Sequence, residues 1–284
     1  MHVNSINSSY KYKNPLFGIN IQSKKLKFNY EDFYVNIKGY GKNQKWANII
    51  RETADSAAQD IRSKLDFDSI LIHVASGVKK ANQIPNDKFL KKLSGVLRIN
   101  RDGWEADDNM GMYDLITRYS CDESKYKPYS SRFDKIAKKG LKNPYYSFFT
   151  TKFMLSKPIV CDTRKKFIKH ADSNYINNSL NMVKKLYCEL HTKYIEQEPN
   201  ASDVDDINSI IAEIRWIIAH STPWLRGSDS IGNVFIRSIY KAIGVKTSPL
   251  KKGVSLDLEA YCTNLEDYKK NFSSYFTRKP YIVK

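Results

Sequence analysis

The chain has 284 residues and a formal net charge of +17, from 47 Lys and Arg side chains against 30 Asp and Glu side chains. With 41% hydrophobic and 13% aromatic residues, the composition excludes a disordered chain and is typical of a folded globular protein. The positive charge suits an acidic partner such as a nucleic acid, an anionic membrane or a phosphorylated substrate, but scattered lysines fit compositional bias equally well.

Cysteine usage and hydropathy narrow the class of protein further. The four cysteines (Cys121, Cys161, Cys188 and Cys262) show no CxxC spacing and no neighbouring histidine at zinc-site spacing. We therefore expect reduced thiols, no metal site and no disulfide framework. The sequence contains no apolar run long enough to cross a bilayer and no signal-peptide core, so we expect no transmembrane segment.

The N-terminus has an unusual composition, because its first acidic residue is Glu31 and Ser and Asn dominate its opening. Such a stretch resembles the leader of bacterial effectors exported by a type III or related system, although an ordinary frayed terminus fits as well. We expect a disordered export leader over residues 1–24, with a secretion chaperone as a candidate partner, and one mainly helical effector domain over residues 25–284.

The first elements are predicted from apolar spacing. Residues 26–41 alternate on two arms around Glu31-Asp32, which predicts a β-hairpin. The alternating positions are Leu26, Phe28 and Tyr30 on one arm and Phe33, Val35 and Ile37 on the other. Residues 44–65 have helical spacing, whereas the run 69–78 fits a buried helix or a strand. Further along, an aromatic segment over residues 145–153 fits a helix face packed in the core.

The C-terminal half contains the strongest helical patterns. We expect helices over residues 172–194 and 205–220, separated by a polar loop whose Ser202 and Asp205 form a capping signature. A short loop over residues 221–228 leads into another helix that Gly244 closes, and alternation near residues 254–260 predicts a short strand. The fold class is mainly α (α+β), with a helical core, a small N-terminal β-hairpin and a short C-terminal strand.

The loop over residues 221–228 concentrates the most usable chemistry in the chain. It follows His220, whose pKa the helix dipole should raise toward physiological pH. Pro223 enforces the end of the helix, and Gly227 permits a tight backbone near a ligand. Arg226 projects from the loop and Arg237 lies two turns into the next helix, so both could meet phosphate at this helix N-terminus.

The segment HSTPWLRGSDSIGN, which begins at His220 and ends at Asn233, resembles the Fic motif HPFxxGNGR, which joins two helices. Pro223-Trp224 stands for Pro-Phe, and Gly227-Ser228 stands for the glycine-polar pair. The resemblance is nearer to a divergent, AvrB-like (Fido) bacterial effector than to an ordinary Fic protein. It implies that the histidine is the general base toward a target hydroxyl, that the loop cradles nucleotide phosphates, and that a nucleotide-derived group is transferred to a protein.

The segment also departs from that motif. Two extra residues separate His220 from Pro223, Asp229 and Ser230 replace the second glycine and the terminal arginine, and Arg226 replaces the acidic metal-binding residue. Because an arginine itself neutralises phosphate charge, we expect no metal at the site. The expected cofactor is a nucleotide, either ATP, UTP or NAD.

These comparisons give a set of candidate site residues. The candidate catalytic residues are His220, Arg226, Asp257 and Glu259, and the candidate cofactor-binding residues are Arg226, Gly227, Ser228, Ser230 and Arg237. Asp257 and Glu259 should share one face of the predicted strand, where a carboxylate could orient a ribose, activate a nucleophile or pair with Arg226. An exposed edge strand explains the same alternation.

The sequence leaves three functions open. The first is a transferase, a secreted effector or toxin that modifies a host protein in the host cytoplasm. The second is a non-catalytic effector that binds a host protein or an acidic surface, with the Pro-Trp turn as a packing corner. The third is a metal-independent ribonuclease toxin, because Arg215 and His220 fit the R-x4-H spacing of HEPN ribonucleases. No groove-reading helix with grouped Arg and Asn is evident, so sequence-specific DNA binding is not expected.

Overall fold

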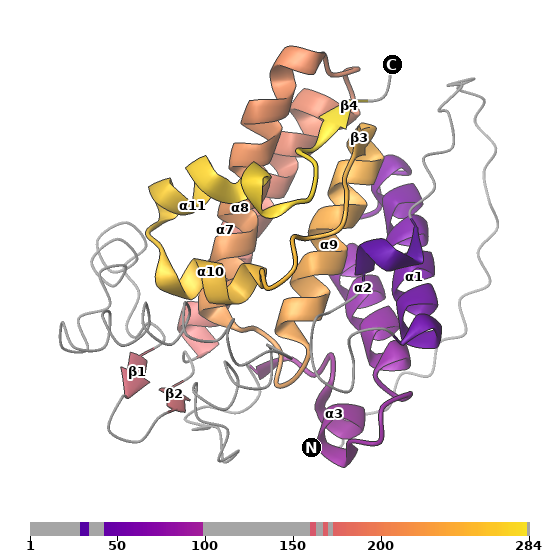
Figure 1. Cartoon of the computed structure of the whole chain (residues 1–284), viewed down its shortest axis with the longest axis vertical. Helices are drawn as coiled ribbons and strands as arrows, with labels where there is room; N and C mark the ends of the chain where they lie inside the picture. The colour runs from indigo at the N-terminus through magenta and orange to yellow at the C-terminus, as the bar shows by residue number, and fades with distance from the viewer. Residues whose placement is uncertain (1–28, 34–42, 99–159, 163–166, 170–172, 283–284) are drawn as a thin grey trace, which may run out of the picture.

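The computed structural model describes residues 29–33, 43–98, 160–162, 167–169 and 173–282, and within them the protein is mainly helical (Figure 1). The N-terminal elements are η1 (Tyr30–Phe33), α1 (Gln44–Arg62), α2 (Phe67–Ala81), α3 (Lys88–Leu93), β1 (Val160–Asp162) and β2 (Phe167–Lys169). The C-terminal elements are α7 (Ser173–Leu190), η3 (His191–Ile195), η4 (Ala201–Asp203), α8 (Val204–Ser221), α9 (Ser228–Ile243), β3 (Val245–Lys246), α10 (Leu256–Cys262), α11 (Leu265–Asn271), η5 (Phe272–Tyr275) and β4 (Tyr281–Ile282).

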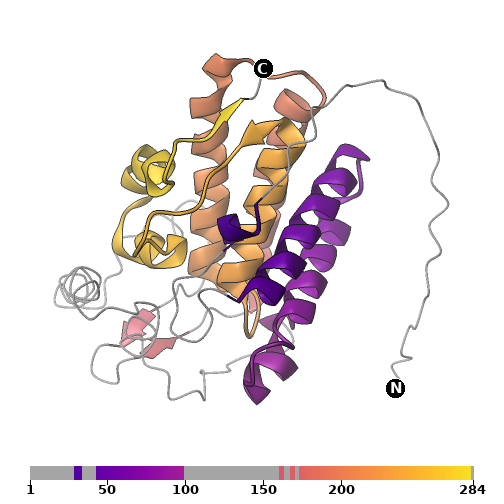
Figure 2. The same ribbon diagram turned by 45° about the vertical axis from the view of Figure 1, so that its right-hand side comes forward.

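Helix α8 lies at the centre of the described helices. It packs against α7, α9, α10 and α11, and α9 in turn packs against the antiparallel pair α1 and α2. Figure 2 shows this order from side to side, with α1 and α2 at one side, α8 and α9 in the middle, and α10 and α11 at the other. Because α8 has neighbours on all sides, most of its residues from Ile207 to Ser221 are buried.

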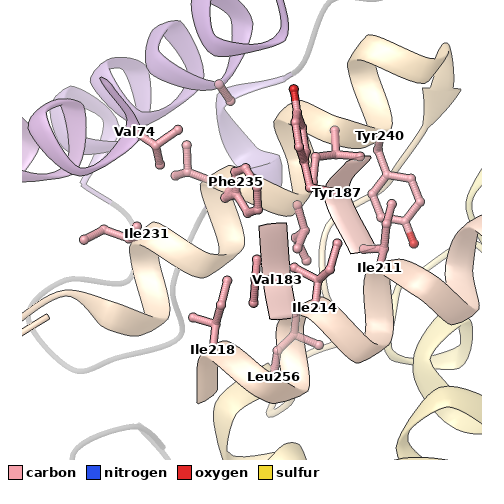
Figure 3. Close-up of a cluster of buried hydrophobic side chains, with 14 of the residues drawn as sticks. Val74, Val183, Tyr187, Ile211, Ile214, Ile218, Ile231, Phe235, Tyr240 and Leu256 are labelled. Atoms are coloured by element: carbon pink, nitrogen blue, oxygen red, sulfur yellow. The ribbon is translucent and has the colours of Figure 1, made fainter. Parts of the chain in front are cut away.

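One hydrophobic core joins these layers (Figure 3). Phe235 of α9 is fully buried, and its ring centroid lies 5.9 Å from that of Phe67 on α2 and 6.1 Å from that of Tyr187 on α7. The aliphatic side chains around it come from α2, α7, α8, α9 and α10 and include Val74, Val183, Ile214, Ile231 and Leu256. The core therefore fixes the position of the loop between α8 and α9.

Local sequence signals explain where several helices begin and end. The side chain of Asn43 accepts a hydrogen bond from the Trp46 amide and caps α1, and Asp66 caps α2 through the Ser69 amide. Helix α9 lies between Gly227 and Gly244, whose φ angles of 85° and 92° are left-handed. Asn200 and Asp203 form a capping box just before α8, two residues earlier in the chain than the pair predicted for this role.

The predicted helices are confirmed, and the ambiguous run over residues 69–78 is helical, as part of α2. The N-terminal hairpin is not seen: residues 30–33 form a 3-10 turn, and the remainder of both arms lies outside the described residues. The turn is stabilised locally, because the Asn29 amide donates to the Asp32 carboxylate over 3.1 Å. The export leader and the aromatic segment over residues 145–153 also lie outside the described residues.

The strand predicted near residues 254–260 is wrong, because α10 begins at Leu256. The alternation of Leu256 with Leu258 arises because this short helix is covered on more than one side, so that both leucines are buried. The strands near the C-terminus are β3 and β4 instead, which pair antiparallel with Val245 opposite Ile282. None of the helices among the described residues is long and apolar enough to span a membrane.

Candidate functional site

The loop between α8 and α9 is held by a segment from the N-terminal third of the chain. The amide of Leu225 donates to the Val96 carbonyl over 2.8 Å, and the Gly95 amide donates to the Arg226 carbonyl over 3.2 Å. Two isolated bridges, Ser94–Arg226 and Leu97–Trp224, give this contact a strand-like form. Backbone groups along one side of the loop therefore have their hydrogen-bond partners within the protein.

Arg98 strengthens the same contact from inside the protein. Its side chain is buried, and its guanidinium donates to the carbonyl of Thr222 from Nε and to that of Trp224 from Nη2, both over 3.2 Å. Its own amide donates to the Pro223 carbonyl over 2.7 Å. A cation at the C-terminal end of α8 also complements the helix dipole. We refer to Ser94–Arg98 as the loop clamp.

His220 lies in the interior, with 2% of its surface exposed. Its Nδ1 is 2.9 Å from the Trp216 carbonyl, to which it donates, and its ring packs against the Trp216 indole at a tilt of 37° with centroids 3.9 Å apart. Burial, assisted by the positive charge of Arg215, lowers the pKa of His220 to about 4. The predicted rise of this pKa by the helix dipole is wrong, because desolvation of the imidazolium outweighs the dipole.

The predicted phosphate cradle forms a compact turn. The hydroxyl of Ser228 accepts from the Trp224 amide over 3.1 Å and donates to the Trp224 carbonyl over 3.0 Å. A Cβ added to Gly227 would meet atoms of Val78, Asn82 and Ser94 at 3.4–3.5 Å, which is ordinary van der Waals contact, so it is the left-handed φ that favours glycine here. Arg226 and Ser230 are half-buried beside this turn.

Arg237 is buried away from the turn. Its guanidinium donates to the Thr247 hydroxyl over 2.8 Å and to the Asp32 carbonyl over 3.2 Å. It also lies over the rings of Phe33 and Phe276, at 5.8 Å and 5.1 Å from their centroids. The structure therefore ties Arg237 to η1 and to the segment around β3, and it does not bring Arg237 together with Gly227 and Ser228.

A polar network underneath the loop joins α8 to the first turns of α9. The guanidinium of the fully buried Arg215 forms an ion pair with Asp229 and donates from Nε to the Asn233 side-chain oxygen over 2.9 Å. The amide of Asn233 in turn donates to the other Asp229 oxygen over 3.1 Å. The side chain of Asp229 is 13% exposed, so the network reaches from the interior to the surface.

Asp257 of α10 lies beside this network. Burial and the negative charge of Asp257 raise the pKa of the Asp229 carboxyl above its ordinary value, against the opposite effects of Arg215 and Asn233. Asp257 itself accepts from the Ser255 hydroxyl and from the Leu258 amide and is half-buried. We call Arg215, Asp229, Asn233 and Asp257 the acidic-arginine cluster.

Glu259, the other predicted carboxylate, is placed differently. It is buried in α10, and its backbone carbonyl accepts from the Thr263 hydroxyl over 2.5 Å. Because these residues form a helix rather than a strand, Asp257 and Glu259 do not share one face. Within the part of the chain that the structure describes, no three His, Cys, Asp or Glu side chains group as metal ligands.

In the sequence, Asp229 stands out only as a departure from the Fic motif, and Arg215 only as half of a ribonuclease motif. The sequence did contain a signal that these two residues could pair. Arg215 and Asp229 lie at equal sequence distances from Thr222, which caps the C-terminal end of α8. Residues placed in this way face each other across a helical hairpin. Arg215 is fully buried against Asp229 and Asn233, so it has no direct access to RNA, which argues against the ribonuclease alternative.

Comparison with known protein families gives a match to an avirulence family. Residues 145–279 match the model of the AvrB/AvrC family, described as avirulence protein, and this range includes α7 to α11 and the whole acidic-arginine cluster. No curated protein matches the chain. The AvrB-like part of the resemblance seen around His220–Asn233 is thereby confirmed. Residues 145–279, just under half of the chain, are therefore similar to the avirulence domain of the AvrB/AvrC family.

Proposed function

We propose that this effector transfers a nucleotide-derived group to a host protein in the host cytoplasm, with the acidic-arginine cluster at the centre of its active site. The observation that carries the proposal is the ion pair of Arg215 with Asp229, a carboxylate whose pKa is raised by burial and by Asp257. The pair lies at the base of the α8–α9 loop and inside the AvrB/AvrC domain.

The energetics of this cluster favour a functional role. Removing charges from water costs several kcal/mol per ion, and apolar residues of similar volume often give equal or greater stability than a buried ion pair. The cluster lies among a large set of buried apolar side chains that include Ile214, Ile218 and Ile231. Perturbed carboxylates of this kind are concentrated in active sites, where their chemistry compensates for the loss of stability.

Asp229 fits the role of general base better than His220 does. A general base works best when its pKa is near the working pH. The pKa of His220 is lowered to about 4, which makes its neutral ring a weak base, whereas the pKa of Asp229 is raised from the usual carboxyl value. In the proposal, Asp229 accepts the proton of the target hydroxyl, Arg215 orients it, and His220 remains the second candidate.

The proposal assigns phosphate binding to the loop turn. Arg226 is half-buried beside Gly227 and Ser228, where its charge could meet a nucleotide phosphate without a metal ion. ATP, UTP and NAD share this phosphate chemistry, and thermal-shift measurements with each one would identify the ligand. A ligand that binds only the native protein raises its melting temperature by mass action.

The decisive experiment is transfer of a radiolabelled nucleotide to host-cell extract by the full chain and its variants. Asp229→Asn should abolish the transfer and retain the ligand-induced thermal shift, and His220→Gln should reduce the transfer less. Asp205→Asn is the matched control, because Asp205 is an exposed carboxylate at the opposite end of α8. Transfer that survives Asp229→Asn, or that stops when EDTA is added, would contradict the proposed chemistry.

The loop clamp favours one other candidate, a non-catalytic effector that binds a host protein. Trp224 and Leu225 are buried at 3% exposure, and the turn is closed by its own hydrogen bonds, as a packing corner requires. In that case Asp229→Asn would retain the host response, and no nucleotide would shift the melting temperature of the protein. The two candidates thus give opposite results with the same variant.

A further inference from the structure

Ser56, His73 and Asp60 form a hydrogen-bonded chain across the α1–α2 pair, outside the AvrB/AvrC domain. His73 Nε2 lies 3.0 Å from the Ser56 hydroxyl, and His73 Nδ1 lies 2.5 Å from an Asp60 carboxylate oxygen. This is the order of groups that activates a serine: the carboxylate orients the imidazole, and the imidazole accepts the hydroxyl proton. We propose that Ser56 is a nucleophilic serine that takes an acyl group from a small activated ester.

The arrangement of these three side chains depends on the close approach of α1 and α2. Ser56 and Asp60 are one turn apart on α1, and His73 faces them from α2. One turn further along α2, Gly77 packs directly against Thr53, since a Cβ at Gly77 would lie 2.2 Å from the Thr53 hydroxyl oxygen. The missing side chain at Gly77 therefore holds the helices close enough for the imidazole to reach both α1 groups.

The tautomer follows from the hydrogen bonds. When Nδ1–H of neutral His73 donates to Asp60, Nε2 is the acceptor and the Ser56 hydroxyl donates to it. The carbonyl of Thr53, 3.2 Å away, is the other acceptor for that hydroxyl. If the ring were doubly protonated, the Ser56 hydroxyl would donate its hydrogen bond to this carbonyl instead. The side chains of His73 and Asp60 are 34% and 35% exposed, so a small molecule can reach them.

The reaction transfers one acyl group. Ser56 Oγ attacks the carbonyl carbon of the ester while its proton passes to His73 Nε2. The bond from that carbon to the leaving oxygen then breaks, and the leaving oxygen takes the proton from Nε2, which yields acyl-Ser56 and a free alcohol. Ser56 lies mid-helix, where backbone N–H groups serve the helix, so we expect one acylation per chain rather than rapid turnover.

The test uses the full chain with p-nitrophenyl acetate and peptide mapping by mass spectrometry. We expect an acetyl ester on Ser56, removable with hydroxylamine, that forms about 100-fold faster than one on Ser69. Ser69 is the matched control, because its hydroxyl donates to the Asp66 carboxylate over 2.6 Å. Equal acetylation of the two serines would overturn the proposal.

Three variants separate activation from a purely structural role. Ser56→Ala should remove the hydroxylamine-sensitive ester and leave the melting temperature nearly unchanged. His73→Ala should lose the ester, and added imidazole should restore it, which a structural role for His73 does not predict. Asp60→Ala should slow acylation and Asp60→Glu should recover part of the rate, as a positioning role requires. An ester on Ser56 that forms at the original rate in His73→Ala without imidazole would refute the inference.

Discussion

Arg215 on α8 and Asp229 on α9 form an ion pair that joins the two helices flanking the α8–α9 loop, and Asn233 completes a closed triangle with both. The two ends of the pair differ in their access to water. Arg215 is fully buried, whereas the Asp229 side chain is 13% exposed. The carboxylate is therefore the member of the pair that a substrate can approach, and the guanidinium is the member that needs its partner for stability.

This difference in burial predicts that removing the two side chains lowers the free energy of unfolding by unequal amounts. Asp229→Ala should lower the free energy of unfolding by about 3 kcal/mol, because a buried guanidinium loses the carboxylate that forms its ion pair. Arg215→Met should cost less, since the remaining carboxylate can reach water and methionine fills much of the space. Urea unfolding of the two variants at pH 7.5 measures both values. A larger loss in Arg215→Met would contradict this account of the pair.

The burial of His220 predicts a specific loss of stability in acid. Its pKa is lowered from 6.5 to about 4 in the folded protein, so the unfolded chain binds a proton at higher pH than the folded chain does. The stability due to neutral His220 is therefore complete above pH 6.5 and declines as the pH falls below it. Between pH 7.5 and pH 5 the loss from this one group should be about 2 kcal/mol.

The measurement is the free energy of unfolding at both pH values in the original protein and in His220→Gln. Glutamine does not titrate, so its loss between pH 7.5 and pH 5 should be smaller by about 2 kcal/mol. Since other groups titrate alike in both proteins, the difference isolates His220. An equal loss would mean that the pKa of His220 is the same in the folded and unfolded states.

Arg98 should contribute strongly to the free energy of unfolding, although it lies outside the AvrB/AvrC domain in the sequence. Arg98→Ala removes charged hydrogen bonds to two carbonyls of the α8–α9 loop and should cost about 3 kcal/mol. Arg98→Lys should not restore the loss, because an ammonium lacks the fork that reaches both carbonyls. Hydrogen exchange at the Leu225 amide, which donates to Val96, should speed up in both variants.

Lys92→Ala is the control for Arg98, because it removes a nearby exposed positive charge from α3. It should change the free energy of unfolding by less than about 0.5 kcal/mol. If Lys92→Ala and Arg98→Ala were equally stable, the loop clamp would contribute nothing beyond net charge.

The helical frame could be predicted from the sequence because apolar spacing is a local signal. Helices α8 and α9 have apolar stripes that end at Pro223 and Gly244, and both boundaries depend on residues close by in the chain. Helix α10 was predicted as a strand, since seven residues with alternating leucines contain too little periodicity to distinguish the two. Only its packing against α8, α9 and α11 shows why Leu256 and Leu258 are both buried.

The candidate site was predictable only in part. The position of the loop between two helices could be predicted from His220, Pro223 and Gly227, but the loop clamp comes from residues more than 120 positions earlier, as the separation of 124 between Arg98 and Thr222 shows. No local pattern reports such a contact. The burial of His220 depends on the same tertiary packing, and it reverses the direction of pKa shift that the helix dipole alone would give.

Gly227 provides a test that separates backbone strain from ligand binding. Gly227→Ala places a Cβ on a residue with φ of 85°, which should cost about 1–2 kcal/mol of stability. Gly244→Ala is a matched variant, because its φ is 92° and its Cβ would meet nothing within 4 Å. The free energies of unfolding of the two variants should differ by less than about 1 kcal/mol, since contacts of 3.4–3.5 Å at Gly227 are ordinary.

The same pair of variants bears on the proposed nucleotide site. If the turn at Gly227 approaches a phosphate, Gly227→Ala should reduce the ligand-induced thermal shift, and Gly244→Ala at the far end of α9 should retain it. The thermal shifts of the two variants can be compared directly. Both variants carry the same kind of backbone strain, so their stabilities should be similar. Equal thermal shifts in the two would place the phosphate elsewhere and leave Gly227 with a conformational role only, through its left-handed φ.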